Sequence, residues 1–425
     1  MKKTSSHSGI LLFFTEMPHS LGVFLKWTGF SILCGVPIGL AGAAFHYLIE
    51  EATHFREGHS FIIWLLPLAG VLIAWMYKAA GMETDGGTNT VLSSVRSEKV
   101  LRFRTAPLIF VSTILTHLFG GSAGREGAAL QLGGSIGVQL GRMLRLDARS
   151  QHLLTLCGMS ACFAALFGTP LTAALFAMEV VNVGAMYYAA LVPCLFSALI
   201  GAGIAGWLGA APTAFALENV PALSLETAAQ AAGLGLLCAG ISILFCVAVH
   251  GAAHGYRRFF PNTLVRAAVG GLLVAALTFL LGTTDYNGAG MGIVTQAIAG
   301  EARPEAFLLK ILFTALTLGA GFRGGEIVPV FFVGATFGCA AAPLLGLAPG
   351  FGAALGLVSV FCGVVNCPLA SLMLGFELFG GQGLPLFAVS AAVSYMLSGY
   401  FGLYSSQRFF YSKTELMRVH WSAWQ

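Results

Sequence analysis

The stretch GTPLTAALFAME, from Gly168 to Glu179, returns in altered form as NCPLASLMLGFE, from Asn366 to Glu377. In both copies a Pro-Leu pair precedes a glutamate that stands nine residues after the proline, and the copies lie 198 residues apart. The cluster GGSIG at Gly133–Gly137 matches GATFG at Gly334–Gly338 at nearly the same spacing. Two matches at one spacing indicate a duplicated chain. Helix breaks at corresponding positions of two halves point to a site between the halves.

The composition excludes most soluble proteins. Of the 425 residues, 57% are hydrophobic and 9% are charged, whereas a soluble domain has about 25% charged residues. A surface with so few charges must face lipid over most of its area. The 55 glycines are typical of closely packed or interrupted membrane helices. We therefore expect an all-α polytopic membrane protein, and we exclude a nucleic-acid binder, a secreted disulfide scaffold and nearly every soluble enzyme.

Proline and glycine interrupt the long uncharged stretches. Ile327–Phe376 has 50 residues without a charge, while one membrane span needs about 20, and it contains Pro343, Pro349 and Pro368. The pattern predicts broken and half-length helices. Such irregular backbone is tolerated within a membrane only where it is buried in protein or lines a watery cavity, so the breaks predict a permeation pathway.

We divide the chain into a cytoplasmic N-terminal segment (1–20), a first membrane repeat (21–220), a second membrane repeat (221–407) and a short C-terminal tail (408–425) without a regulatory domain. The basic residues Arg96, Lys99, Arg102 and Arg104 indicate a cytoplasmic loop. The nine cysteines stand at apolar positions without the spacing of a metal site. We interpret them as small hydrophobic residues and expect no metal and no cofactor.

Two glutamates each follow a glycine-rich turn at the start of an apolar helix. Glu126 stands in GSAGREGAALQ and Glu326 in GFRGGEIVP. A carboxylate at mid-membrane costs about 2.5–3.5 kcal/mol, and the N–H groups of a helix N-terminus offset part of that cost. The same N–H groups would bind a free anion, so each carboxylate can compete with a transported anion for one site. The alternative for Glu126 is a helix cap paired with Arg125 at a membrane surface.

Four motifs resemble those of the CLC family of anion channels and proton-coupled antiporters. They are GREG at Gly124–Gly127, GEIVP at Gly325–Pro329, GLYSS at Gly402–Ser406 and GGTNT at Gly86–Thr90. The resemblance implies a fold of two inverted repeats, a homodimer with one pathway per subunit, and Glu126 as the gating glutamate. It also implies an anion pathway formed by Gly87, Thr88, Asn89, Arg125, Gly127, Gly325, Ile327, Val328 and Tyr404.

The departures from the usual motifs resemble the fluoride-exporting branch of the family. Asn89 replaces a glycine of the first motif, and Glu326 adds a carboxylate to the second. Glu179 aligns with the first of two acids that chloride/proton antiporters carry, but Val180 replaces the second, which leaves Glu326 as the candidate coupling glutamate. The resemblance thus implies a fluoride/proton antiporter that exports fluoride. The alternative is a chloride-type member, either a chloride/proton antiporter or a voltage-gated channel.

The expected partners are a halide anion, protons and the lipid bilayer. By resemblance we expect a multi-pass protein of a bacterial inner membrane, and we do not expect an enzyme. An intramembrane hydrolase could be imagined from Ser122 with His117 nearby. That hypothesis is weak because a serine nucleophile needs a positioned base and an oxyanion hole, and catalysis would not require a duplicated acid.

Overall fold

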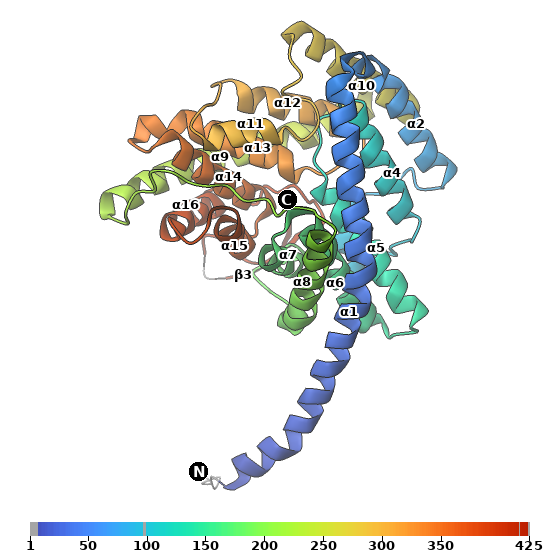
Figure 1. The fold of residues 1–425 in the computed structure, drawn as a ribbon, viewed down its shortest axis with the longest axis vertical. Helices are drawn as coiled ribbons and strands as arrows, with labels where there is room; N and C mark the ends of the chain where they lie inside the picture. The colour runs from blue at the N-terminus through green and yellow to red at the C-terminus, as the bar shows by residue number, and fades with distance from the viewer. Residues whose placement is uncertain (1–6, 97–98, 416, 424–425) are drawn as a thin grey trace.

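The computed structural model describes residues 7–96, 99–415 and 417–423, and over these residues the chain is almost entirely helical (Figure 1). The α-helices of the first half are α1 (His7–Gly58), α2 (Leu66–Ala79), α3 (Thr88–Val95), α4 (Thr105–Leu118), α5 (Glu126–Met143), α6 (Ala148–Phe167), α7 (Pro170–Glu179) and α8 (Leu191–Trp207). Those of the second half are α9 (Leu225–Phe259), α10 (Thr263–Leu281), α11 (Met291–Ile298), α12 (Ala306–Gly319), α13 (Ile327–Ala341), α14 (Pro349–Val365), α15 (Pro368–Phe379) and α16 (Leu384–Leu397). Short 3₁₀ helices are η1 (Ser60–Leu65), η2 (Tyr188–Ala190) and η3 (Ala342–Leu345).

A small sheet is the one departure from the expected all-α fold. Strand β1 (Asn182–Val183) pairs in parallel with β2 (Arg408–Tyr411), and β2 pairs antiparallel with β3 (Arg418–Ser422). The C-terminal segment is therefore attached to the end of α7 in the first half. Sequence patterns did not predict this sheet because each strand is five residues or shorter.

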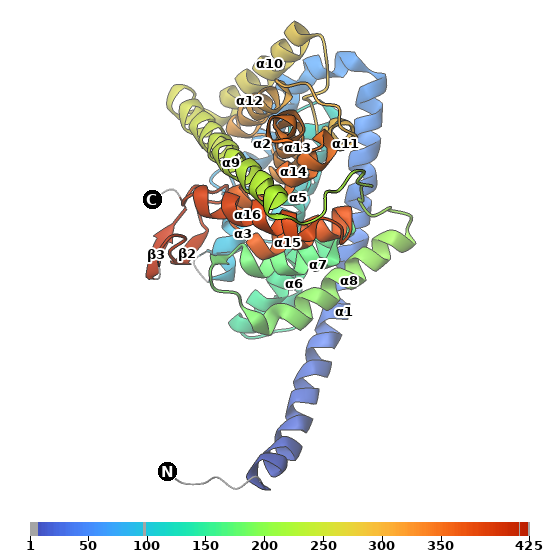
Figure 2. The same cartoon turned by 90° about the vertical axis from the view of Figure 1, so that its left-hand side faces the viewer.

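The packing pattern of the first eight helices is repeated by the last eight. Helix α5 packs on α6 as α13 packs on α14, α1 on α8 as α9 on α16, and α4 on α5 as α12 on α13. Figures 1 and 2 show the blue-to-green half and the yellow-to-red half side by side, with α2 and α10 in contact between them. The predicted N-terminal boundary at residue 20 falls inside α1, which continues through Pro18 without a break. The rest of the predicted domain division stays a prediction.

The duplicated Pro-Leu segments explain how the halves are related. The carboxylate of Glu179, at the end of α7, accepts hydrogen bonds from Leu369 N (3.2 Å) and Ala370 N (2.9 Å) in the first turn of α15. Near the end of α15, Glu377 accepts from Leu171 N (2.9 Å) and Thr172 N (2.8 Å) in the first turn of α7. Each helix thus places its acid on the positive N-terminus of the other. This reciprocity requires antiparallel helices, which confirms the inverted repeats.

The repeated glycine clusters allow two helix pairs to cross closely. A Cβ atom at Gly133 or Gly137 of α5 would collide with the backbone of α6, and one at Gly334 or Gly338 of α13 would collide with the backbone of α14. Glycines four residues apart therefore form one flat stripe on each helix, as in membrane helix pairs generally. The glycine repeat in the sequence is a packing feature, and it brings both helices to the centre of the molecule.

Within the described residues, seven helices are long and apolar enough to cross a membrane. They are Met17–Gly58, Ser60–Ala79, Ala148–Phe167, Tyr188–Trp207, Leu225–Phe259, Thr263–Leu281 and Ile327–Leu345. Other apolar helices, such as α4, α12 and α15, are shorter than a full span. The stretch Ile327–Phe376 is divided into α13, η3, α14 and most of α15, which confirms the predicted breaks. The nine cysteines are buried free thiols, in agreement with their interpretation as hydrophobic residues.

Candidate functional site

The two glycine-rich turns meet at the centre of the molecule. Gly124 N donates to Gly325 O and Gly325 N donates to Gly124 O, each at 2.6 Å, as an antiparallel bridge. Helices α5 and α13 begin directly after this bridge, so their N-termini converge on it. A Cβ atom at Gly325 would lie 2.5 Å from Gly127 N and 2.8 Å from Glu126 N, so only glycine permits this approach. The motifs GREG and RGGE therefore create a region with many unpaired N–H groups.

Glu126 occupies the first turn of α5 with its side chain fully buried. Its Oε2 accepts from Arg125 N at 3.0 Å, and its Oε1 lies 3.7 Å from Arg125 Nε. Oε1 has no hydrogen-bond partner within the described part of the chain. Glu126 is thus paired with Arg125, as the cap alternative expects. One buried carboxylate oxygen nevertheless has no described hydrogen-bond donor, whereas the carboxylate of a structural cap would normally have its oxygens satisfied.

Arg125 is shared among several acceptors. Nη1 lies 2.8 Å from His46 Nδ1, and Nη2 donates to Leu166 O at 3.3 Å. His46 Nε2 lies 3.4 Å from a carboxylate oxygen of Glu50. Since arginine can only donate, His46 Nδ1 must accept, and His46 carries its proton on Nε2 in this arrangement. His46 therefore holds the guanidinium beside Glu126, and no local sequence pattern indicated this role.

Glu326 occupies the N-cap position of α13, directly after the bridge, and its side chain makes no capping hydrogen bond. A Cβ atom at Gly127 would lie 2.8 Å from Glu326 Oε2, so this oxygen sits against the first turn of α5. Oε2 is also buried without a hydrogen-bond partner among the described residues. Both predicted glutamates therefore lie at the junction of the two repeats. Each has one buried oxygen that no donor satisfies.

The first motif contributes a third helix N-terminus. Gly87 has φ +61°, which places α3 so that Thr88 Oγ1 donates to Gly127 O at 3.3 Å. Asn89 Oδ1 accepts from Ser406 N at 2.9 Å. Because a backbone N–H can only donate, the atom facing Ser406 is the amide oxygen, and the two N–H donors of Asn89 point elsewhere.

Tyr404 approaches the same region from the C-terminal segment. Its side chain is buried, with 1% of its surface exposed, and its hydroxyl has no partner among the described residues. A lipid-facing tyrosine of an aromatic belt would be exposed, so the burial favours the pathway role over that alternative.

Two cavities approach the bridge and share no lining residue. One, of about 650 Å³, is lined by Gly87, Thr88, Asn89, Gln131, Glu326 and Tyr404, with Arg257, Arg266 and Arg323 among the other residues. The other, of about 480 Å³, is lined by His46, Arg125, Glu126 and Val328, with Asp285 and Asn287 among the others. Each glutamate faces a different cavity. Arg125 therefore lies with Glu126, away from the cavity that holds Asn89 and Tyr404.

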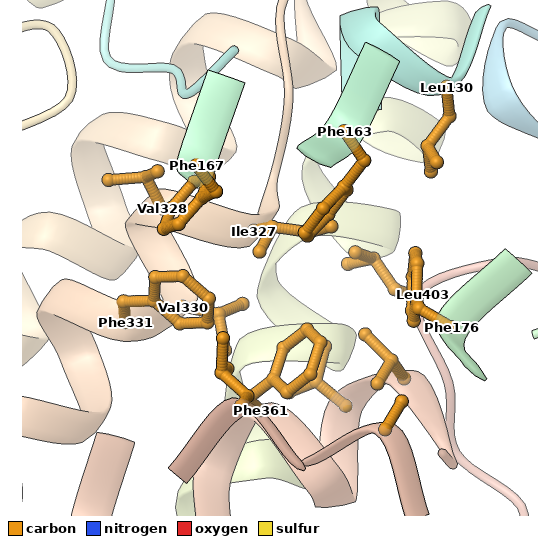
Figure 3. Packing of buried hydrophobic residues seen from close by; sticks show 14 of the residues in the cluster. Leu130, Phe163, Phe167, Phe176, Ile327, Val328, Val330, Phe331, Phe361 and Leu403 are labelled. Atoms are coloured by element: carbon orange, nitrogen blue, oxygen red, sulfur yellow. The ribbon is translucent and has the colours of Figure 1, made fainter. Parts of the chain in front are cut away.

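An apolar core packs around the first turn of α13 (Figure 3). Ile327 and Val328 are buried, and Figure 3 shows their side chains close to Phe163 and Phe167. Phe331 packs edge-on against Phe167, with ring centroids 5.6 Å apart. The side chains of Ile327 and Val328 thus belong to the core, so only their backbone N–H groups could contact an anion.

Gln131 was not identified from the sequence, although it lines the larger cavity. Its Nε2 donates to Thr88 Oγ1 (3.3 Å) and to Gly127 O (3.2 Å), and its buried Oε1 has no described partner. A polar residue one helical turn after Gly127 in an apolar helix was the available signal. Glu179, in contrast, lines neither cavity because its carboxylate caps α15.

Ser122 and His117 make separate hydrogen bonds. Ser122 Oγ pairs with Thr314 Oγ1 at 3.1 Å, and His117 Nδ1 lies 2.9 Å from Thr113 O. Neither bond joins the serine to the histidine as a nucleophile and its base would be joined. Within the described residues, no group of three or more His, Cys, Asp or Glu side chains could hold a metal ion.

Comparison with known proteins agrees with this geometry. The family model described as "Voltage gated chloride channel" matches residues 69–399. A "Chloride/fluoride channel protein" of Pseudomonas syringae pv. tomato is 36% identical over 395 residues, which cover 91% of this chain and 87% of that protein. An "H(+)/Cl(-) exchange transporter ClcA" of Salmonella arizonae is 26% identical, covering 81% of this chain and 79% of that protein. The solved structure of a CLC-type fluoride/proton antiporter has a TM-score of 0.88 and 33% identity, covering 91% of this chain and 98% of that one.

Proposed function

Because this chain belongs to the CLC family of voltage-gated chloride channels and is a multi-pass membrane protein, we propose that it exports fluoride in exchange for protons. The observation that carries the proposal is the pair of buried glutamates at the meeting point of two inverted repeats. Each faces its own cavity, and each has a buried oxygen without a donor. A relative named for chloride and fluoride and a solved fluoride/proton antiporter support the same activity.

The exchange of proton and anion follows from the chemistry of a carboxylate at a helix N-terminus. When ionised, Glu126 occupies the N–H groups at the start of α5 as a tethered anion. When it is protonated, its charge is lost and a free anion binds the same N–H groups more favourably. Glu326 gives the larger cavity, which Tyr404 also lines, a group that can accept or release a proton. One glutamate per cavity therefore permits transport of a proton and an anion in opposite directions.

The residues around Glu326 favour fluoride over chloride. Fluoride is small, so a site must replace its water shell with short, strong donors. Asn89 presents its amide N–H groups because its oxygen is held by Ser406 N. Tyr404 lines the same cavity with a hydroxyl that has no partner among the described residues, and a protonated Glu326 would add another O–H donor. We expect a preference for fluoride of at least about 10-fold, equivalent to about 1.4 kcal/mol.

We also infer a homodimer in a bacterial inner membrane, with Arg96, Lys99, Arg102 and Arg104 on the cytoplasmic side. The bacterial relative and the family support this assignment. The halide and the protons would then move between the cytoplasm and the outside through each subunit.

Purified protein in liposomes tests the proposal directly. Fluoride efflux is followed with a fluoride electrode and proton uptake with a pH electrode, and the same vesicles are then loaded with chloride. We expect fluoride efflux coupled to proton uptake, and much slower chloride efflux. Equal fluoride and chloride fluxes with proton coupling would reassign the protein as a chloride/proton exchanger. Anion flux without proton movement would identify a passive channel.

A further inference from the structure

A third cavity lies apart from the two that approach the glutamates. It has a volume of about 410 Å³ and is lined by the basic residues Arg96, Arg149 and His152 and by apolar residues that include Leu153, Leu156 and Met178. Among the described residues, none that lines this cavity also lines either of the other two cavities, and none is a carboxylate. Guanidinium groups beside an apolar wall fit a ligand that carries both a phosphate and a hydrocarbon chain.

The position of this cavity suits the headgroup region of a membrane. Arg149 lies in the first turn of α6, at one end of the candidate span Ala148–Phe167. Tyr187, another lining residue, is 54% exposed and directly precedes the span Tyr188–Trp207. Arginine and tyrosine at the ends of spans mark the membrane interface. Basic pockets between helices on the cytoplasmic side bind anionic lipid headgroups in other membrane proteins.

Arg96 connects this cavity to the larger cavity of the pathway. Its Nη1 donates to Val181 O at 3.1 Å and its Nη2 donates to Ser406 O at 2.6 Å. Ser406 in turn donates its N–H to Asn89 Oδ1 and stands two residues after Tyr404. A phosphate bound to Arg96 would compete with Ser406 O for the hydrogen bonds of the guanidinium. It would thereby loosen the segment that positions Asn89 and Tyr404.

We propose that this cavity binds the phosphate of an anionic phospholipid between Arg96 and Arg149, with the acyl chain along the apolar wall. The occupied site shifts the hydrogen bonding of Arg96 away from Ser406 and so changes the rate of transport. The binding step is independent of the proposed function, whereas the effect on transport rests on it. A failure of lipid binding and a failure of the proposed transport function can therefore be distinguished, because each is measured separately.

Native mass spectrometry of the purified chain with phosphatidylglycerol tests the binding step. Arg149→Gln removes one guanidinium from the cavity, and we expect it to weaken lipid retention about 10-fold, as for loss of one charge-assisted contact. Arg102→Gln is the matched control, because it removes the same charge from an exposed residue that does not line the cavity. Equal retention by wild type and Arg149→Gln would overturn the proposal.

Competition separates a lipid from a soluble phosphate. Inorganic phosphate or glycerol phosphate at the concentration of the lipid should not displace phosphatidylglycerol, because neither can use the apolar wall. Full displacement at equal concentration would overturn the lipid assignment in favour of a soluble anion.

The effect on transport is measured in liposomes of phosphatidylcholine with and without phosphatidylglycerol. We expect fluoride efflux by the wild type and by Arg102→Gln to change at least about 3-fold between the two compositions, while Arg149→Gln responds little. A lipid response of Arg149→Gln as large as that of Arg102→Gln would show that surface charge alone acts, and would overturn the coupling.

Discussion

The carboxylate of Glu126 accepts a hydrogen bond from Arg125 N and lies 3.7 Å from the Arg125 guanidinium, but its Oε1 has no hydrogen-bond partner among the described residues. Glu126→Gln keeps the shape of the side chain but can neither release a proton nor act as a tethered anion. We expect fluoride-driven proton uptake in liposomes to fall at least about 10-fold, which corresponds to about 1.4 kcal/mol. Glu301→Gln, at an exposed position, is the matched control and should leave the coupling unchanged. A Glu126→Gln protein with normal proton coupling would rule out Glu126 as the gate.

Glu326 is the second residue to test, because its carboxyl group lies at the N-cap position of α13 and lines the cavity that contains Tyr404. Glu326→Gln should abolish or strongly slow coupled fluoride transport while the purified protein keeps its gel-filtration volume. The reason is that the amide cannot exchange a proton with the cavity that contains Tyr404. Normal transport by this variant would identify Glu326 as a helix cap only.

Asn89 should determine how strongly fluoride is preferred. Asn89→Gly removes two N–H donors and also the acceptor for Ser406 N. We expect the ratio of fluoride to chloride efflux to fall in this variant. Ser406→Ala serves as the control, since it keeps the backbone N–H that Asn89 accepts and should keep the ratio. An unchanged ratio in Asn89→Gly would separate fluoride selectivity from this side chain.

Sequence patterns singled out polar residues at helix starts, whose roles stay predictions, more readily than the residues that contact them. Glu126, Glu326 and Asn89 were recognised because they stand at glycine-rich helix starts or depart from a motif. His46 was not recognised because its role depends on a contact across 79 residues. Gln131 offered a local signal, as a polar residue one turn after Gly127 in an apolar helix, but its contact with Thr88 spans 43 residues. Such distant contacts are set by how the helices pack, and a single sequence does not contain that information in a local pattern.

At the scale of helices, α7 and α15 depend on each other for their N-terminal caps. Glu377→Ala leaves Leu171 N and Thr172 N without their acceptor, so we expect a loss of stability of about 2 kcal/mol. Thermal unfolding of the purified protein in detergent measures the loss, and Glu218→Ala at an exposed position is the control. The proton coupling of the active fraction should be unchanged. Loss of coupling without loss of stability would instead place this acid in the transport cycle.

The sequence revealed this helix pair as a repeat but not as a contact. Two Pro-Leu segments with an acid nine residues on are visible by inspection, and in the structure α7 and α15 begin at their prolines. The exchange of caps required the second helix to lie antiparallel against the first. Orientation is a property of the folded pair, and sequence similarity is the same for parallel and inverted repeats.

At the scale of the whole molecule, every group that we assign to the pathway comes from one chain. The N-termini of α3, α5 and α13 and the segment with Tyr404 meet within it, and both cavities are lined by its residues. A homodimer would therefore contain two complete pathways. Composition predicted the membrane class and the repeats predicted the two halves. Neither predicted the small sheet that joins the C-terminal segment to α7, because its strands are short.

Two complete pathways should transport independently. In a dimer made by joining two copies of the chain with a flexible linker, one copy carrying Glu326→Gln, we expect about half the fluoride flux of the joined wild-type pair, with the same proton-to-fluoride ratio. The reason is that no group of the intact pathway belongs to the altered copy. A joined pair with Glu301→Gln in one copy controls for the linker. A joined pair with Glu326→Gln in both copies gives the residual flux. If one altered copy lowered the flux to that residual value, the two pathways would depend on each other, and transport would require changes shared across the dimer.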